Sequence, residues 1–358
     1  MRPGWTSATL GFVRPKPVIP AAATALTGAE AAVPLSDLDR RIVAALQING
    51  RATWQQVANV VGASESAVSR RANRMIKQGV LRVFAAADPL LCGLGYPVLL
   101  QIECAVGAAG AVARTLAARP DVRFVALLGG GYDLVVELIV PSRAHLTAVL
   151  VEELNTVPGI VRTTTENVVR TFKTSYDWGR TLLGDAAALL DRPPETASPP
   201  ELDDIDLRLI QLLTADGRSS VTDLAERLAV SESMARRRLE QLTASGCLRF
   251  GTLIDSELLG YHWELFVWLG VDLGCLDRIA RELATHPEVR YVSATAGYSD
   301  LACEVVLRDH EDLYRFNTEV LGSLEGVNRV EIGTELHTVK RAYVNVSTRY
   351  GVPEARLL

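Results

Sequence analysis

The chain is built from two copies of one unit, and this repeat constrains its fold more than any other feature. When the 358-residue sequence is shifted by 167 positions, residues 36–83 match residues 203–250 at 15 of 48 positions. The register then holds with almost no net insertion, so that RPDVRFV (119–125) aligns with HPEVRYV (286–292). Because a long repeat at a fixed period indicates one architecture built twice, the fold of a single unit predicts most of the chain.

The first part of each unit has the pattern of three short helices. In residues 37–79 apolar side chains recur at helical spacing. Thr53 and Ser64 are suited to cap the second and third helices, and Gly62 permits the sharp turn between them. The strand-like segment LRVFAAA follows, and the second copy repeats these features and ends in LRFGTLI. We therefore predict a winged helix-turn-helix in each copy.

The second part of each unit predicts a ferredoxin-like domain. In the first copy, strand-like and helical segments follow one another in the order YPVLLQIECAV, AAGAVARTLAARP, VRFVALL, YDLVVELIV, SRAHLTAVLVEEL and IVRTTTENVV. This is the order β-α-β-β-α-β, and the second copy repeats it from WELFVWLGVD to VNRVEIGTELHTV. The predicted fold class is thus α+β, with two tandem units, each a winged helix-turn-helix followed by a βαββαβ domain.

The third helix of the first copy carries a basic stripe. Arg70, Arg74 and Lys77 are spaced i, i+4, i+7 and share one face, which suits contact with phosphates and base edges in a major groove. The alternative is a solvated face on an interaction module. The candidate DNA-binding residues are Ser64, Ser66, Ser69, Arg70, Arg71, Asn73, Arg74 and Lys77 in the first copy, and Ser231, Ser233, Arg236, Arg237 and Arg238 in the second.

The two copies differ in charge. Residues 36–83 carry eight Lys or Arg against three acids, whereas residues 203–250 carry seven Arg against eight acids. Gln241 and Ala244 stand where the first copy has Arg74 and Lys77. We expect the first copy to supply most of the non-specific affinity for DNA, because phosphate contacts dominate that affinity.

These motifs together resemble one known family. LDRRI, GRAT, GASESAVSRR and QGVLR, followed by a βαββαβ domain, are similar to the Lrp/AsnC (feast/famine) transcriptional regulators over residues 36–176 and again over 203–343. The usual member has one unit, so this chain resembles a fused tandem form. The resemblance implies amino-acid-responsive control of transcription by dimers or higher assemblies, with paired βαββαβ (RAM) domains holding the effector between them.

The residues that match the family's effector loop form the turn of each central hairpin. They are Gly129, Gly130, Gly131, Tyr132 and Asp133 in the first copy, and Gly297, Tyr298, Ser299 and Asp300 in the second. Glycines allow backbone N–H groups to approach a carboxylate, and an aspartate can pair with an ammonium group. The alternative is that the glycines only close the hairpin and the aspartate bonds its own turn.

The resulting organisation has seven parts. They are a flexible Ala/Pro-rich tail (1–34), helix-turn-helix 1 (35–83), RAM domain 1 (84–176), a Pro-rich linker poor in core residues (177–201), helix-turn-helix 2 (202–250), RAM domain 2 (251–346) and a C-terminal tail (347–358).

Composition limits the remaining functions. A net charge of −5 argues against indiscriminate coating of nucleic acid, and no apolar run approaches the 18 residues of a membrane span. The five cysteines are scattered without a C-x-x-C pair, which suits a reducing, cytoplasmic location and indicates neither a disulfide framework nor a zinc site. We expect no cofactor, no metal and no membrane partner. The expected partners are double-stranded DNA, a small effector such as an amino acid, and further copies of the chain.

Two other functions remain open at this point. Siroheme decarboxylases resemble this fold and also occur as two fused units, but their middle strands are rich in His and Tyr. Here those strands read RFVALLGGGYDLVVE and RYVSATAGYSDLACE, with no histidine, and His337 is predicted to be a surface or interface residue on the last strand. The other alternative is a sensor that does not bind DNA and acts through protein partners.

Overall fold

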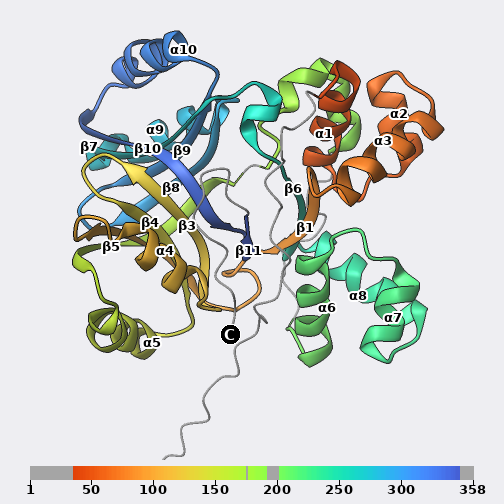
Figure 1. Ribbon diagram of the computed structural model, residues 1–358, viewed down its shortest axis with the longest axis horizontal. Coiled ribbons are helices and arrows are strands. Elements are labelled where there is room, and N and C mark those ends of the chain that lie inside the picture. Colours follow the sequence, from red (N-terminus) through yellow and green to blue (C-terminus); the bar gives the residue numbers. More distant parts are fainter. Residues whose placement is uncertain (1–34, 175, 192–200, 347–358) are drawn as a thin grey trace, which may run out of the picture.

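The computed structural model describes residues 35–174, 176–191 and 201–346. The tails predicted at 1–34 and 347–358 lie outside these residues. Each unit begins with three helices and one strand, as predicted (Figure 1). The first copy has α1 (Asp37–Ile48), α2 (Trp54–Val61), α3 (Glu65–Lys77) and β1 (Arg82–Ala87), and the second has α6 (Asp204–Ala215), α7 (Val221–Leu228), α8 (Glu232–Ala244) and β6 (Leu248–Leu253).

Helix starts follow from side chains that cap the free N–H groups. Thr53 and Ser64 cap α2 and α3 by accepting bonds from the N–H groups of Gln56 and Ala67. Gly62 ends α2 with a left-handed φ of 68°. In the second copy the same position is Ala229, which adopts a φ of 57° although it carries a Cβ.

The strand that follows each set of helices pairs with its counterpart in the other copy. β1 and β6 form an antiparallel two-stranded sheet, with Arg82 opposite Leu253 and Ala87 opposite Leu248. Helix α1 packs against β6 and helix α6 packs against β1. The two helix-turn-helix units are therefore joined through exchanged strands, and each core includes residues of the other copy.

The second part of each unit has the predicted βαββαβ order. The first copy has β2 (Tyr96–Cys104), α4 (Ala109–Ala117), β3 (Val122–Gly129), β4 (Leu134–Val140), α5 (Arg143–Thr147) and β5 (Ile160–Thr174). The second has β7 (Trp263–Val271), α9 (Leu276–Thr285), β8 (Val289–Ala296), β9 (Leu301–Leu307), α10 (His310–Arg315), β10 (Val327–Arg341) and the short β11 (Val344–Asn345). Helices α5 and α10 each continue as a wider π-helical turn, at Ala148–Glu153 and Phe316–Val320.

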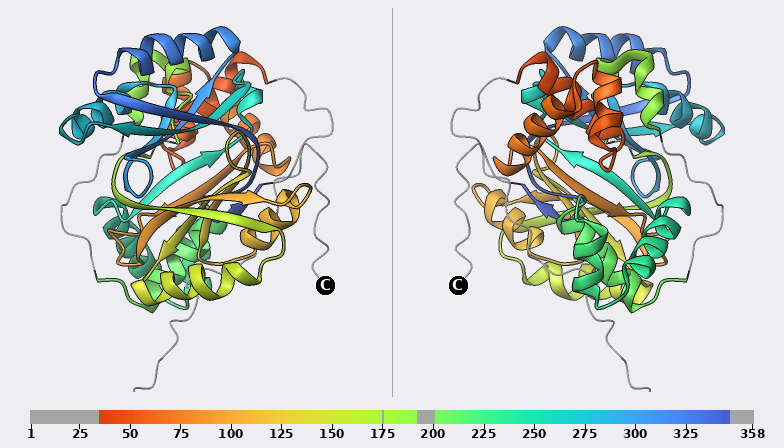
Figure 2. Two further views of the ribbon diagram at one scale, coloured as in Figure 1. Left: turned by 90° about the vertical axis from the view of Figure 1, so that its left-hand side faces the viewer. Right: turned by 90° about the vertical axis from the view of Figure 1, so that its right-hand side faces the viewer.

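The two βαββαβ domains share one closed sheet. Its eight long strands follow the order β10-β3-β4-β2-β5-β8-β9-β7, and β7 pairs again with β10 to close the ring. The short β11 adds to the end of β10. The junctions between copies are β3 with β10 and β5 with β8. Helices α4 and α5 cover the outer face of one half, and α9 and α10 cover that of the other (Figure 2). The inner faces meet in a mixed core that includes Phe124, Phe266 and Trp268.

Two equivalent lysines tie each domain to a helix of the other. Lys340 on β10 donates to the carbonyls of Ala117 and Arg119 at the end of α4, at 2.9 and 2.7 Å. Lys173 on β5 donates to the carbonyl of His286 at the end of α9, at 2.8 Å. A cation at a helix C-terminus satisfies the last carbonyls and favours the helix dipole. The pairing of the two domains thus also caps their helices.

The predicted linker is corrected over its first half. Residues 192–200 lie outside the description, but Arg180–Leu190 forms a short helical segment. Trp178, Leu183 and Leu190 are buried in the core of the first helix-turn-helix. The Leu and Ala of RTLLGDAAALL therefore add to that core, because they cover α1 and α2.

Candidate DNA-binding and effector sites

Helix α3 presents the predicted basic face to solvent. Arg70, Asn73, Arg74 and Lys77 are exposed, while Val68, Ala72 and Met75 are buried in the core. Within the described part of the chain, Arg70 and Lys77 make no ion pair, and Arg74 lies 3.5 Å from Asp39. Ser64 caps the helix and its hydroxyl lies 3.3 Å from that of Ser66, so both sit at the helix start. Asn73 donates to the hydroxyl of Ser69.

Arg71 faces the interior of its own unit. Its guanidinium lies 3.1 Å from the buried carboxylate of Asp39 and bonds the hydroxyl of Ser36. Burial disfavours the charge of Asp39, yet the bonds from Ser36 and Arg71 hold the pKa of that carboxyl below its usual value. Arg238 repeats this role in the second copy, 2.8 Å from both Asp203 and Asp206. These two arginines join α3 to α1 and α8 to α6.

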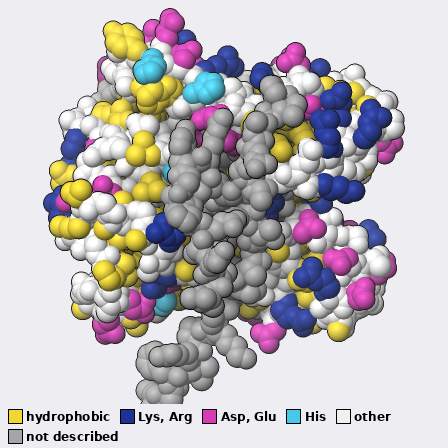
Figure 3. Space-filling view, in the orientation of Figure 1, with side chains coloured by type: hydrophobic (Ala, Val, Ile, Leu, Met, Phe, Trp, Pro, Cys, Tyr) yellow, Lys and Arg dark blue, Asp and Glu magenta, His cyan; other side chains and the backbone are white. Residues whose placement is uncertain are grey.

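The equivalent helix α8 has a mixed surface. Ser231 caps it and lies 3.0 Å from Ser233, and Arg236 and Arg237 are exposed. Glu240 is exposed where α3 has Asn73. Lys and Arg side chains gather over the lobe of α1 to α3, whereas Asp and Glu alternate with them over the lobe of α6 to α8 (Figure 3).

A cavity of about 300 Å³ lies between the two βαββαβ domains, beside the predicted effector loops. Both domains contribute to it, through strands β2 and β5 and the β3–β4 turn on one side, and the β8–β9 turn and β10 on the other. The residues that line it are Gln101, Glu103, Gly131, Tyr132, Arg162, Thr164, Tyr298 and Glu331. The space beside Gly131 is narrow, because an added Cβ would lie 2.5 Å from the Glu331 carboxylate.

The cavity combines charges of both signs with neutral polar groups. Arg162 donates to Glu103 at 2.9 Å, and Glu331 supplies a second carboxylate. The amide nitrogen of Gln101 is buried without a partner among the described residues. Trp268 donates to the hydroxyl of Tyr132, and burial raises the pKa of that hydroxyl. Such a site can offer a cation to a carboxylate and a carboxylate to an ammonium group.

The predicted loop residues divide into three groups. Gly131, Tyr132 and Tyr298 line the cavity. Asp133 instead accepts a bond of 2.7 Å from the N–H of Cys104, and Asp300 accepts one of 2.9 Å from the N–H of Val271. Both aspartates thus hold their turn to the neighbouring strand. Gly129, Gly130, Gly297 and Ser299 shape the turns and lie outside the cavity lining.

The second loop is arranged differently, because it encloses a side chain of the first copy. Glu166 on β5 is fully buried, and one of its oxygens accepts bonds from the N–H groups of Tyr298 and Ser299, at 3.1 and 3.0 Å. Arg329 stacks on the ring of Tyr298 and donates to the Tyr298 carbonyl and the Ser299 hydroxyl. Burial raises the pKa of Glu166 to about 7, against the effect of these N–H groups.

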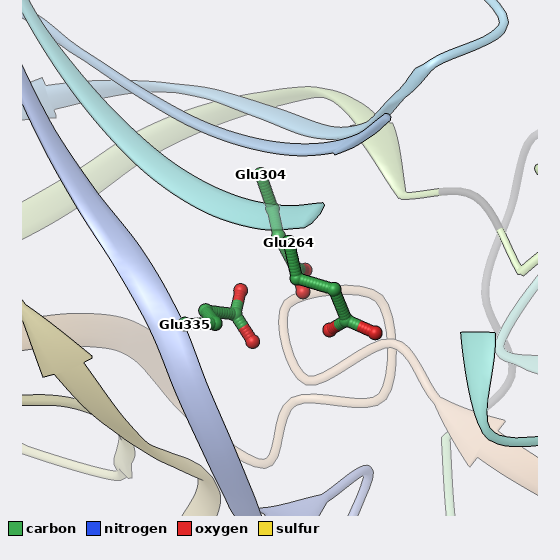
Figure 4. A group of neighbouring side chains, drawn as sticks. All are labelled: Glu264, Glu304 and Glu335. Atoms are coloured by element: carbon green, nitrogen blue, oxygen red, sulfur yellow. The ribbon is translucent and has the colours of Figure 1, made fainter. Parts of the chain in front are cut away.

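Three carboxylates meet inside the second domain, but they belong to an ion-pair network. Glu264, Glu304 and Glu335 approach within 4.8 Å of one another (Figure 4). Arg290 contacts Glu264 and Glu304 at 2.5 Å, and Arg341 contacts Glu304 at 2.7 Å and Glu335 at 3.2 Å. Burial and the nearby Glu304 charge raise the pKa of Glu335. The charges of the two guanidiniums balance those of two carboxylates, and the raised pKa of Glu335 favours a neutral third carboxyl group. The cluster therefore has little net negative charge with which to hold a metal ion.

Sequence reasoning missed three sets of residues. They are Gln101, Glu103, Arg162, Thr164 and Glu331 in the cavity, Glu166 in the second loop, and Arg51 and Arg218, which donate hydrogen bonds from one helix-turn-helix unit to the other. The sequence did contain a sign that Glu166 differs between the copies, because the equivalent position at the 167-residue offset is Gly333. His337 was predicted as a surface or interface residue, and it lies on β10 opposite Leu127 of β3, at the junction of the two domains.

Family models match both halves of each unit. The AsnC-type helix-turn-helix domain matches residues 35–76 and 202–243, and the Lrp/AsnC ligand binding domain matches residues 98–178 and 264–344. The chain belongs to the Lrp/AsnC family of transcriptional regulators and carries both domains of that family twice. None of the described helices has both the length and the apolar composition that a membrane span requires.

Relatives match one unit of the chain at a time. An HTH-type transcriptional regulator of Pyrococcus horikoshii is 31% identical over 147 residues, which are 41% of this chain and 93% of that protein. The leucine-responsive regulatory protein of Rhizobium meliloti is 30% identical over 146 residues, 40% of this chain and 94% of that protein. The siroheme decarboxylase NirDL has a similar fold over 87% of this chain and 94% of its own, with a TM-score of 0.57 and 16% identity.

Proposed function

We propose that this protein is a sequence-specific DNA-binding regulator in which one chain places two helix-turn-helix units on DNA. The exposed face of α3 carries this proposal, since Arg70 and Lys77 are free of ion pairs with described residues. The β1–β6 sheet supports it, because it fixes the two recognition helices relative to each other without a second chain. Two such helices in one body suit two half-sites of one operator.

We further propose that the cavity between the βαββαβ domains binds a small zwitterion. The twenty amino acids are the first molecules to test as ligands. Arg162 is placed to meet a carboxylate, and Glu103 or Glu331 to meet an ammonium group. Because strands of both domains line the cavity, a bound molecule can bias how the domains pair. Coupling between such sites is typically about 1–3 kcal/mol, or about 5- to 150-fold in affinity.

A mobility-shift assay with the upstream region of the protein's own gene tests both parts. We expect a shifted complex with the free protein and a change in its apparent Kd with at least one amino acid. The Arg162→Ala variant should bind DNA and lose the amino-acid response. If no DNA of the upstream region is bound above a scrambled control, the regulator proposal fails. If DNA is bound but no amino acid alters Kd or Tm, only the effector proposal fails.

A decarboxylase is the second candidate, because the fold is similar to that of NirDL over most of the chain. Identity of 16% supports the fold alone, and the middle strands β3, β4, β8 and β9 carry no histidine. Much of the inner face of the sheet is filled by Phe124, Phe266, Trp268 and the Arg290 and Arg341 ion pairs. A visible absorption scan of the protein mixed with siroheme separates the candidates, since binding would shift the tetrapyrrole bands.

We also propose that chains assemble further through surfaces outside the closed sheet. The eight-stranded ring pairs its strands within one chain, so assembly has to use other faces. Light scattering at micromolar concentration should give a multiple of 38.8 kDa. A strict monomer, with and without amino acids, would exclude this assembly and leave the intrachain pairing untouched.

A further inference from the structure

The turn between β8 and β9 holds a carboxylate in the way a ligand would be held. One oxygen of Glu166 accepts the N–H groups of Tyr298 and Ser299, and the other oxygen has no partner among the described residues. Glu166 is fully buried, and Gly297 leaves room for it, since an added Cβ there would collide with the carboxylate. Two converging backbone N–H groups on a glycine turn form an anion-binding concavity.

The first copy has no carboxylate at the position of Glu166, and the Glu331 carboxylate beside Gly131 comes from a different position of β10. Position 333, the equivalent of Glu166 at the 167-residue offset, is a glycine on β10. Gly333 lies against the turn of the first copy, because a Cβ added at Gly130 would lie 3.2 Å from the Gly333 Cα. Here the structure has the 300 Å³ cavity lined by Gly131 and Tyr132, which correspond to Tyr298 and Ser299.

The two equivalent arginines beside these loops, Arg329 and Arg162, also differ between the occupied and the open loop. Arg329 is fixed on the filled loop, 4.0 Å above the ring of Tyr298 and bonded to the Tyr298 carbonyl. Its equivalent Arg162 is 69% exposed, pairs with Glu103 and lines the open cavity. The filled loop therefore uses its arginine to close the turn, whereas the open loop leaves its arginine at the cavity edge.

We propose that Glu166 is a built-in carboxylate that occupies the second copy's loop as an effector carboxylate occupies the first, so that each chain has a single vacant effector site. The β8–β9 turn is thus a carboxylate-binding site that the Glu166 side chain of the same chain always occupies. The statement about the effector rests on the proposed function, but the occupation of the second loop by a carboxylate is testable without any effector.

Acetate tests this occupation by chemical rescue. Glu166→Ala leaves the two N–H groups without an acceptor in a space of carboxylate size. At pH 8, 100 mM sodium acetate should raise the Tm of Glu166→Ala by about 2 °C or more beyond sodium chloride at the same ionic strength, because it binds only the folded state. The wild type and Glu166→Gln, in which the loop remains filled, should respond equally to the two salts. An equal response of all three proteins would overturn the proposal.

Hydrogen exchange on the wild type provides a measurement that needs no variant. The amides of Tyr298 and Ser299 should exchange at least about tenfold more slowly than those of Gly131 and Tyr132, since only the former donate to a buried carboxylate. Similar rates in the two loops would contradict the proposal even if Glu166→Ala fails to fold.

Stoichiometry then connects the loop to the effector. For any amino acid that raises the Tm of the wild type, calorimetric titration should give one site per chain. Gly333→Glu, which copies Glu166 into the first site, should abolish that binding, and its Cβ meets only ordinary contacts with Leu128. Two sites per wild-type chain would refute the single vacancy. If no amino acid binds, the effector proposal fails, while acetate rescue still decides the role of Glu166.

Discussion

Arg51 and Arg218 occupy equivalent positions, and each donates to backbone carbonyls of the other copy. Arg51 bonds the carbonyls of Gly217 and Ser219 at 2.8 and 3.1 Å, and Arg218 bonds those of Gly50 and Ala52 at 2.6 and 3.2 Å. Burial, and then the nearby Arg51 charge, lower the pKa of Arg218 to about 10. Both remain charged at neutral pH, and together with β1 and β6 they hold the two helix-turn-helix units in one orientation.

The first prediction concerns this reciprocal pair. Arg51→Ala or Arg218→Ala should lower the free energy of unfolding by about 1–3 kcal/mol, because buried carbonyls lose their donors. DNA affinity should also fall, although neither residue lies on α3 or α8. Urea denaturation and mobility shift measure the two effects. Arg227→Ala, which removes only a surface pair 3.9 Å from Asp223, is the control and should change stability by less than about 0.5 kcal/mol.

The second prediction concerns the salt dependence of DNA binding. Arg70→Ala with Lys77→Ala should reduce the slope of log K against log salt by about two, since each phosphate contact contributes about 0.9. Arg236→Ala with Arg237→Ala should reduce it less, because α8 also exposes Glu240. Affinities measured between 50 and 200 mM salt decide this. Equal reductions would show that both helices engage phosphates alike.

The third prediction separates Arg71 from the exposed arginines. Arg71→Ala removes the guanidinium that lies 3.1 Å from the buried Asp39 carboxylate, so it should destabilise the first helix-turn-helix while leaving the salt slope nearly unchanged. Asp39→Asn should have a similar effect on Tm. Arg238→Ala should act in the same way on the second copy. If Arg71→Ala lowers the salt slope without changing Tm, Arg71 contacts a DNA phosphate instead.

The fourth prediction is a pH dependence that depends on Glu166. Its pKa is about 7 in the folded chain, against 4.5 for an ordinary glutamate. The folded state therefore holds the proton across this window, and the resulting stabilisation is complete below about pH 4.5 and lost as the pH rises to about 7. Arg329 opposes this shift and Asp300 supports it. The stability of the wild type relative to Glu166→Gln should fall between pH 5 and 7.5, and parallel curves would contradict the assignment.

The fifth prediction concerns the turn that ends α7. Ala229 adopts a φ of 57°, where the first copy has Gly62 at 68°. A left-handed residue with a Cβ costs about 1–2 kcal/mol, so Ala229→Gly should stabilise the chain by about 1 kcal/mol. Gly62→Ala should destabilise it by a similar amount. Thermal unfolding of both variants gives the comparison, and a loss of Tm in Ala229→Gly would contradict it.

Residues close together in the sequence were sufficient to predict the helices and strands. The pairing of strands and side chains between the two copies could be seen only in the structure. Caps such as Thr53 and Ser64 and the βαββαβ order follow from residues close in sequence. Periodicity shows which face of β1 is buried but does not name β6 as its partner. The contact between Glu166 and Ser299 spans 133 positions and depends on the register of β5 against β8. The ion pair between Arg71 and Asp39 could have been predicted from the sequence, because both residues recur at the 167-residue offset as Arg238 and Asp206.

The β1–β6 sheet also determines how binding depends on the amount of protein. A pair of recognition units drawn from two separate chains falls apart when the protein is diluted below the dissociation constant of the dimer. Here the two units belong to one chain, and a covalent tether keeps them at an effective concentration of about millimolar at any dilution. Under the proposed function, occupancy of an operator by one such chain follows the first power of protein concentration, because each chain carries both helix-turn-helix units.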